Sequence, residues 1–122
     1  MSIQPQAEIL LNGVTATTTS RGVPLDNAGR VSIQLIATGV STGTGTFTVD
    51  VSNDGITWTP YQRLIPNLTG TNSQTDAYVQ SKVLNSTGSS MVFISAGDTF
   101  ALMRVTCTRA TDGTYSAITY VN

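Results

Sequence analysis

The sequence lacks most of the side chains that catalysis and metal binding need. Its 122 residues include no histidine, one cysteine (Cys107) and one lysine (Lys82), and only 11% of the residues are charged, against about 25% in an average soluble domain. Histidine is the usual proton-transfer group near neutral pH and the commonest metal ligand. These absences exclude a Ser-His-Asp triad, a Cys–His nucleophile pair, an internal disulfide and a thiolate zinc cluster. We therefore expect a protein that is not an enzyme and that needs no metal or cofactor.

A strong charge of one sign and long apolar runs are also missing. The formal net charge is -1 and the isoelectric point is near 4.9. The few basic residues are scattered, which argues against a phosphate-binding face. No apolar run approaches the roughly 20 residues of a transmembrane helix, and the N-terminus does not have the pattern of a signal peptide. We expect a soluble chain, made in the cytoplasm, that binds neither nucleic acid nor membrane.

Hydroxyl-bearing residues take the place of charge. The chain contains 21 threonines and 12 serines, whereas good helix formers are sparse. Branching at Cβ favours the extended backbone. In Thr46–Ser52 the apolar residues Phe47, Val49 and Val51 alternate strictly with polar ones, which is the period of a half-buried strand. The sequence therefore predicts an all-β protein.

The same pattern predicts the other strands and their arrangement. About seven to nine short antiparallel strands, separated by turns, indicate one β-sandwich or barrel, and we favour a jelly roll. The apolar run Met91–Ala96 is expected to be covered on both faces. The remaining expected strands are Glu8–Leu11, Val14–Thr19, Val31–Leu35, Ile56–Thr59, Val79–Val83, Ala101–Thr108 and Thr114–Val121.

The segment Asn53-Asp54-Gly55 after Thr46–Ser52 predicts a hairpin turn. Glycine accepts a positive φ without steric cost, and Asn and Asp side chains bond to nearby backbone N–H groups in turns. The strand after the turn should end at Pro60, or lie at a sheet edge, because proline has no N–H to donate to a neighbouring strand.

The first seven residues are expected to form an N-terminal arm, and residues 8–122 the β-sandwich domain. The arm is too short and has too few apolar residues to form a core element, and chain ends fray unless something holds them. Such an arm can add a strand to the sheet edge of a neighbour, so it is a candidate contact with other subunits. Its residues are Met1, Ser2, Ile3, Gln4, Pro5, Gln6 and Ala7.

Three aromatic residues leave two interpretations open. Trp58, Tyr61 and Tyr78 could form a stacking platform for a sugar, or they could be half-buried packing partners, which is the more common role of such rings. Cys107 alternates with polar neighbours in a strand. We expect it to be a small buried hydrophobic residue rather than a reactive thiol.

The segment Val-Ser-Asn-Asp-Gly-x-x-Trp, within Thr46 to Thr59, resembles a turn found in virion proteins of tailed phages. The Thr- and Gly-rich character of the whole chain is similar to that of small capsid decoration (cement) proteins, head fibres and tail accessory proteins. A similar turn also occurs in discoidin-like carbohydrate-binding sandwiches. The resemblance to decoration proteins implies a small β-rich domain, commonly a trimer, that sits on the outer shell across junctions of the major capsid protein, with an arm that reaches onto neighbours.

Composition and resemblance together predict a virion structural protein that binds the outer capsid surface and stabilises the phage head. Short hydroxyl side chains and low charge suit a surface that is packed against other subunits. The expected partners are the major capsid protein and copies of this chain around a three-fold axis, assembled on the capsid exterior after synthesis in the host cytoplasm. Two alternatives stay open: a carbohydrate-binding module of a tail or fibre that uses Trp58 with Tyr61 or Tyr78, and a head–tail connector or tail accessory protein.

Overall fold

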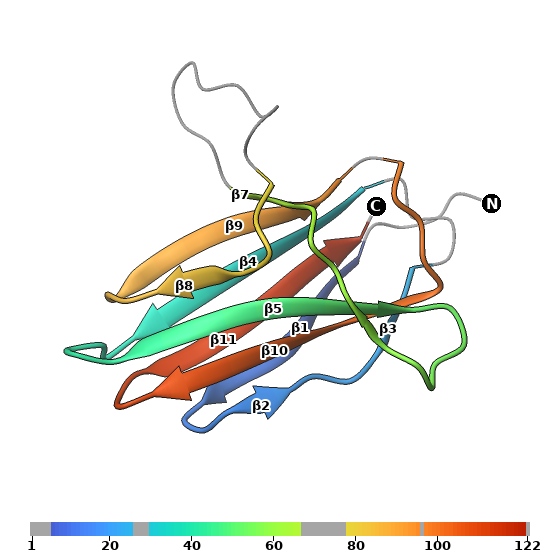
Figure 1. The fold of residues 1–122 in the computed structure, drawn as a ribbon. Helices are drawn as coiled ribbons and strands as arrows, with labels where there is room; N and C mark the ends of the chain where they lie inside the picture. Colours follow the sequence, from blue (N-terminus) through green and yellow to red (C-terminus); the bar gives the residue numbers. More distant parts are fainter. Residues whose placement is uncertain (1–5, 26–29, 67–77, 96, 122) are drawn as a thin grey trace, which may run out of the picture.

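The chain forms two antiparallel β-sheets that face each other (Figure 1). The computed structural model describes residues 6–25, 30–66, 78–95 and 97–121. The strands are β1 (Gln6–Val14), β2 (Thr18–Thr19), β3 (Val23–Pro24), β4 (Val31–Thr38), β5 (Thr44–Ser52), β6 (Thr59–Pro60), β7 (Leu64–Pro66), β8 (Lys82–Leu84), β9 (Gly88–Ile94), β10 (Leu102–Ala110) and β11 (Thr114–Val121). No described residue belongs to a helix that is long and apolar enough to cross a membrane.

The strand pairing is that of a jelly roll. Sheet A has the order β1-β11-β4-β9-β7, and sheet B has the order β2-β10-β5-β6, with β3 paired to β10 and β8 paired to β5. The first strand thus pairs with the last, β2 and β3 with β10, β4 with β9, and β5 with β6. Such nested pairing is what a long hairpin makes when it wraps around a core. The predicted β-sandwich is confirmed, and its connectivity is that of the favoured jelly roll. The described residues form eleven strands rather than the expected seven to nine, because several edge strands are only two or three residues long.

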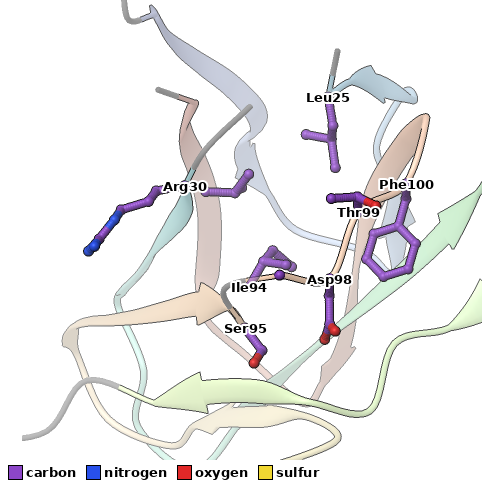
Figure 2. Close-up of a pocket in the computed structure, with 9 residues that line it drawn as sticks. Leu25, Arg30, Ile94, Ser95, Asp98, Thr99 and Phe100 are labelled. Atoms are coloured by element: carbon purple, nitrogen blue, oxygen red, sulfur yellow. The ribbon is translucent and has the colours of Figure 1, made fainter. Parts of the chain in front are cut away.

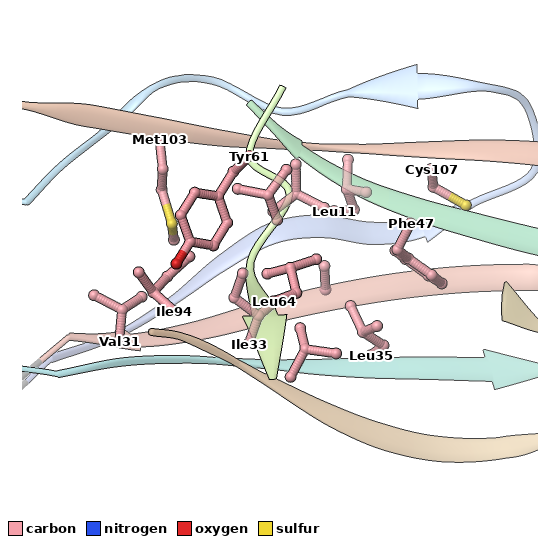
Figure 3. Packing of buried hydrophobic residues seen from close by; sticks show 14 of the residues in the cluster. Leu11, Val31, Ile33, Leu35, Phe47, Tyr61, Leu64, Ile94, Met103 and Cys107 are labelled. Atoms are coloured by element: carbon pink, nitrogen blue, oxygen red, sulfur yellow. The ribbon is translucent and has the colours of Figure 1, made fainter. Parts of the chain in front are cut away.

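The core lies between the two sheets and consists mainly of the inward residues of the long strands, with Tyr61 and Leu64 packed among them (Figure 3). Phe47, Val49 and Val51 of β5 are all buried, as their alternation predicts. Cys107 of β10 is 0% exposed, so the expectation of a small buried hydrophobic residue is confirmed. Burial also raises the pKa of the Cys107 thiol to about 11, because the thiolate would lose its hydration. The thiol therefore stays protonated and unreactive near neutral pH.

Several expected strands differ from the structure. Of the expected strand Val14–Thr19, Val14 ends β1 and only Thr18–Thr19 forms a strand of its own, β2. The run Met91–Ala96 is not covered on both faces, because Phe93 of β9 is 37% exposed and no second layer lies over its outer side in the described chain. The expected strand Val79–Val83 is replaced by β8, while Val79 forms an isolated bridge with Leu64. Val83 points outward and is 47% exposed, because its strand is only an edge addition to β5.

The first strand begins before the expected boundary at residue 8. Gln6 pairs with Val121 and Ala7 pairs with Tyr120, so both residues belong to β1. The boundary between arm and domain is thus moved by two residues, because the last strand offers backbone partners to these positions. The rest of the predicted arm, Met1 to Pro5, lies outside the described residues.

The connection between β4 and β5 is held by an aspartate from the opposite turn. The carboxylate of Asp112, between β10 and β11, accepts hydrogen bonds from the backbone N–H groups of Ser41, Thr42 and Gly43 at 3.0–3.2 Å. These bonds stabilise the ionised form, and they hold the pKa of Asp112 below its usual value of 3.8. The two turns at this end of the sandwich are therefore joined to each other.

The ring of Tyr115 fills the space beneath the same two turns. The side chain is 0% exposed, its hydroxyl donates to the carbonyl oxygen of Asp112 at 2.9 Å, and its ring meets Phe47 edge-on at 6.2 Å. Gly45 in β5 and Gly113 after the β10–β11 turn both lie against it, since a Cβ on either residue would come within 3.0 Å of Tyr115. Both glycines are needed because the tyrosine ring occupies the space of their missing side chains.

Candidate functional site

The acidic residues of the described part of the chain are dispersed rather than clustered. No group of three or more His, Cys, Asp or Glu residues there lies close enough to hold a metal ion. Three acidic residues are paired with arginines at 3.2–3.4 Å: Glu8 with Arg21, Asp50 with Arg104, and Asp98 with Arg63. These carboxylates are thus neutralised by neighbours rather than set against one another across a cleft.

The predicted turn Asn53-Asp54-Gly55 is present, and its aspartate organises it. Asp54 Oδ1 accepts hydrogen bonds from the backbone N–H groups of Ile56 and Thr57 at 2.9 and 2.8 Å and from the Ser52 hydroxyl at 2.9 Å. Those N–H groups are therefore not available for a β ladder. This is why the expected strand Ile56–Thr59 is shortened to β6, which ends at Pro60 on the sheet edge, as predicted for a proline.

Asn53 has a different role from the one its position suggests. Its Oδ1 accepts a hydrogen bond from the backbone N–H of Ala101 at 2.9 Å, so it ties the turn to the start of β10 instead of bonding within the turn. Gly55 has φ +77°, the left-handed conformation that glycine adopts most easily. The turn is therefore a structural feature that closes one end of sheet B.

The stability of this turn depends on pH. The hydrogen bonds from Thr57, Ile56 and Ser52 lower the pKa of Asp54 from its usual 3.8 to about 2. Since the folded pKa lies below the unfolded one, the contribution of the carboxylate is present above pH 4 and is lost as the pH falls towards 2. We expect Asp54→Asn to lower the melting temperature at pH 6 and to match the wild type at pH 2. Thermal unfolding across this range measures the difference; a constant difference would contradict the assignment.

The three aromatic candidates do not share one surface. Trp58 lies on the outer side of sheet B, where the Arg104 guanidinium covers its ring at 4.4 Å. Tyr61 is only 5% exposed and packs edge-on against Phe100 at 5.4 Å, whereas Tyr78 is 44% exposed and has Arg63 over its ring at 4.8 Å. The structure therefore brings each ring to a separate partner and forms no common stacking platform from them.

Tyr61 takes part in a polar cluster that sequence patterns do not show. Its hydroxyl donates to Asp98 Oδ2 at 2.7 Å and accepts from the Ser95 N–H at 2.9 Å. Burial, and then the bond to Asp98, raises the pKa of Tyr61 well above its usual value of 10.0. Arg63 completes the cluster by pairing with Asp98 and donating to the Tyr78 hydroxyl at 3.1 Å. The cluster fastens the β9–β10 connection to the segment after β6.

A small cavity lies beside this cluster (Figure 2). Its volume is about 40 Å³, far below the roughly 300 Å³ of a small ligand-binding pocket. Ser95 and Asp98 face it with Ile94 and Phe100, while the Arg30 side chain extends away from them (Figure 2). The cavity suits ordered water, and it is not a substrate site.

The outer side of sheet B is an array of threonines, which we call the Thr face. Thr106 pairs with Thr48 on one side and Thr19 on the other, and Thr108 pairs with Thr46. The hydroxyls of Thr19 and Thr106 are 2.9 Å apart and hydrogen-bonded. Beyond the threonines, the next cross-strand pair is Arg104 and Asp50, which neutralise each other. This face therefore presents hydroxyl groups with little net charge.

The outward residues of the described sheet A strands, which we call the sheet A face, include no charged side chain and several exposed apolar ones. Four of its strands, β4, β7, β9 and β11, contain no charged residue, and Glu8 of β1 is paired with Arg21. Ile9, Tyr120 and Phe93 are 58%, 44% and 37% exposed. The outward residues are Ala7, Ile9, Ser32, Gln34, Ile36, Thr38, Ile65, Ser89, Met91, Phe93, Thr114, Ser116, Ile118 and Tyr120.

An uncharged face with several exposed apolar side chains is unusual on a chain that works alone, because contiguous apolar patches promote association. The sequence predicts the alternation within each strand, but the composition of the face depends on which strands become neighbours. The two outer faces are thus the candidate functional surfaces of this protein.

Comparison with known proteins adds a fold relationship. No protein-family model and no curated protein matches the sequence. The structure is similar to the crystal structure of the SPBc2 prophage-derived protein YomS, with a TM-score of 0.64 over 100% of this chain and 97% of that chain. The two sequences are 10% identical, so the similarity shows a shared fold.

Proposed function

We propose that this protein is a structural component of a phage virion, which binds the outer capsid surface and stabilises the head. The observation that carries the proposal is the pair of broad outer sheet faces, on which the only charged outward residues of the described strands are Arg104 and Asp50, which pair with each other. Such faces suit contact with other subunits. The shared fold with a prophage-derived protein supports a phage origin.

The proposed partner of the Thr face is the major capsid protein. Short hydroxyl side chains lose little rotamer entropy when they are covered, and they donate and accept hydrogen bonds to any backbone they meet. The predicted arm, now limited to Met1 to Pro5 because Gln6 and Ala7 belong to β1, would add contacts with neighbouring subunits. A protein that binds the assembled shell and not the free capsid subunits stabilises the shell in proportion to its occupancy and affinity.

Heating decorated and stripped particles tests the proposal. We expect decorated particles to rupture at a higher temperature, and equal rupture temperatures would overturn the stabilising role. Thr106→Glu should reduce occupancy on the particle, because it buries a charge at the Thr face. Ser86→Glu, in the exposed β8–β9 turn, introduces the same charge as a matched control and should leave occupancy unchanged. Electron microscopy of labelled virions that placed the protein only at the neck or tail would overturn the capsid assignment.

A further inference from the structure

We propose that the sheet A face is a self-association interface, on which a second copy of this chain packs about a two-fold axis parallel to β4. The proposal does not depend on the capsid role, since it uses only the composition and register of sheet A. It replaces the three-fold arrangement that the resemblance implied. Both outer faces are then occupied in a virion: sheet A by a copy, and sheet B by the shell.

The absence of charged residues on the sheet A face favours a second copy of this chain as the partner. An average protein surface carries many lysines, arginines and carboxylates, and the sheet A face has no charged group in β4, β7, β9 or β11 with which to pair them. Covering those groups would remove their hydration, and the sheet A face has no opposite charge that could compensate for this loss. A second copy of the same face brings no charge, and its exposed apolar side chains have the same need to be covered. The chemistry therefore favours a copy of this chain over an unrelated surface.

The cross-strand register makes the face complementary to itself. Gln34 lies in the central strand, between Ile118 of β11 and Met91 of β9. In the adjacent row, Ser32 lies between Tyr120 and Phe93. A two-fold axis parallel to β4 exchanges the β11 side with the β9 side.

This exchange places apolar residues of one copy opposite apolar residues of the other, and the central amide opposite its own copy. Ile118 of one copy then faces Met91 of the other, and Tyr120 faces Phe93, so that apolar residues meet in both rows. Gln34 meets its own copy, and a side-chain amide can donate to and accept from a second amide. Each contact away from the axis occurs twice, and the interface closes as a dimer.

The size of the face is sufficient for a reversible dimer. Five strands at about 4.8 Å spacing span about 24 Å, and six residues at about 3.4 Å span about 20 Å. Two such faces in contact bury about 1,000 Å² in total, which is the lower limit for a specific interface. We therefore expect a dimer that dissociates on dilution.

Sedimentation of the full chain over a range of concentrations tests the stoichiometry. We expect a monomer–dimer equilibrium for the wild type. Tyr120→Lys should raise the dimer dissociation constant by at least about tenfold, because it places a charge inside the interface. Tyr120 is 44% exposed, so the fold should tolerate the change, which thermal unfolding checks. Thr106→Lys, on the Thr face, is the matched control and should leave the equilibrium unchanged.

Chemical cross-linking tests the axis. Cys107 is buried, so Gln34→Cys introduces an accessible thiol next to its own copy, and facing sheets lie about 10 Å apart, within reach of a short bismaleimide. We expect efficient covalent dimers from Gln34→Cys and none from Thr106→Cys. A wild type that stays monomeric, a trimer, or a dimer that Tyr120→Lys does not weaken would overturn the proposal. If the wild-type protein formed the dimer but did not bind capsids, only the capsid role would be refuted.

Discussion

Replacing Gly45 with alanine is expected to lower the free energy of unfolding by about 3 kcal/mol, with a fall in melting temperature on the order of 10 °C. The added Cβ would come within 3.0 Å of the Tyr115 ring. This ring is 0% exposed, is tied to Asp112 through its hydroxyl and has Gly113 against it. The Tyr115 ring therefore cannot move away from the added methyl group. Urea denaturation followed by far-ultraviolet circular dichroism measures the change.

Two variants separate this steric effect from other consequences of losing a glycine. Gly39→Ala should cost about 1 kcal/mol, because Gly39 has φ +64° but no atom within 4 Å of the added Cβ. In a Tyr115→Leu background the smaller side chain leaves room for a methyl group, so Gly45→Ala should cost less than about 1 kcal/mol there. Equal costs in both backgrounds would show that the Tyr115 ring is not the cause.

Two isoleucines of the same strand should respond very differently to truncation. Ile33 of β4 is 0% exposed between the sheets, whereas Ile36 belongs to the sheet A face. Ile33→Ala should lower the free energy of unfolding by about 3–4 kcal/mol, since it leaves a cavity in a closely packed core. Ile36→Ala should cost less than about 1 kcal/mol, because an outward side chain leaves no cavity.

The comparison is best made by urea denaturation at one low protein concentration, because self-association would add to the apparent stability. The dependence of the unfolding free energy on urea should be the same for both variants if neither alters the unfolded state. A large loss for Ile36→Ala in the monomer would mean that this side chain is part of the core, and that the sheet A face has been assigned to the wrong side.

Local residue patterns were sufficient to predict most of the long strands. The alternation around Phe47 and Val49 indicates β5, and the segment after Gly113 indicates the bounds of β11 as the structure has them. These strands are long enough for a period of two to be read, and their inward residues are apolar. The burial of Cys107 follows from the same alternation.

Short strands and long-range hydrogen bonds could not be predicted from local residue patterns. The strands β3 and β7 have two and three residues, too few for a period, and they exist because β10 and β9 offer them free edges. The bond from Ala101 to Asn53 and the cluster around Asp98 join residues that are 35 to 48 positions apart. Such bonds depend on the packing of whole strands.

The amino-acid sequence by itself determined the all-β character, the positions of the main strands and the scarcity of catalytic groups, because each depends on residue type and on neighbours along the chain. Only the tertiary structure decided that Trp58 would stack on Arg104 while Tyr61 and Tyr78 joined the Asp98 cluster. It also decided that four strands without charge would lie side by side in one sheet. Which residues share a face is set by strand order, and strand order results from the jelly-roll pairing of segments that are distant in the chain.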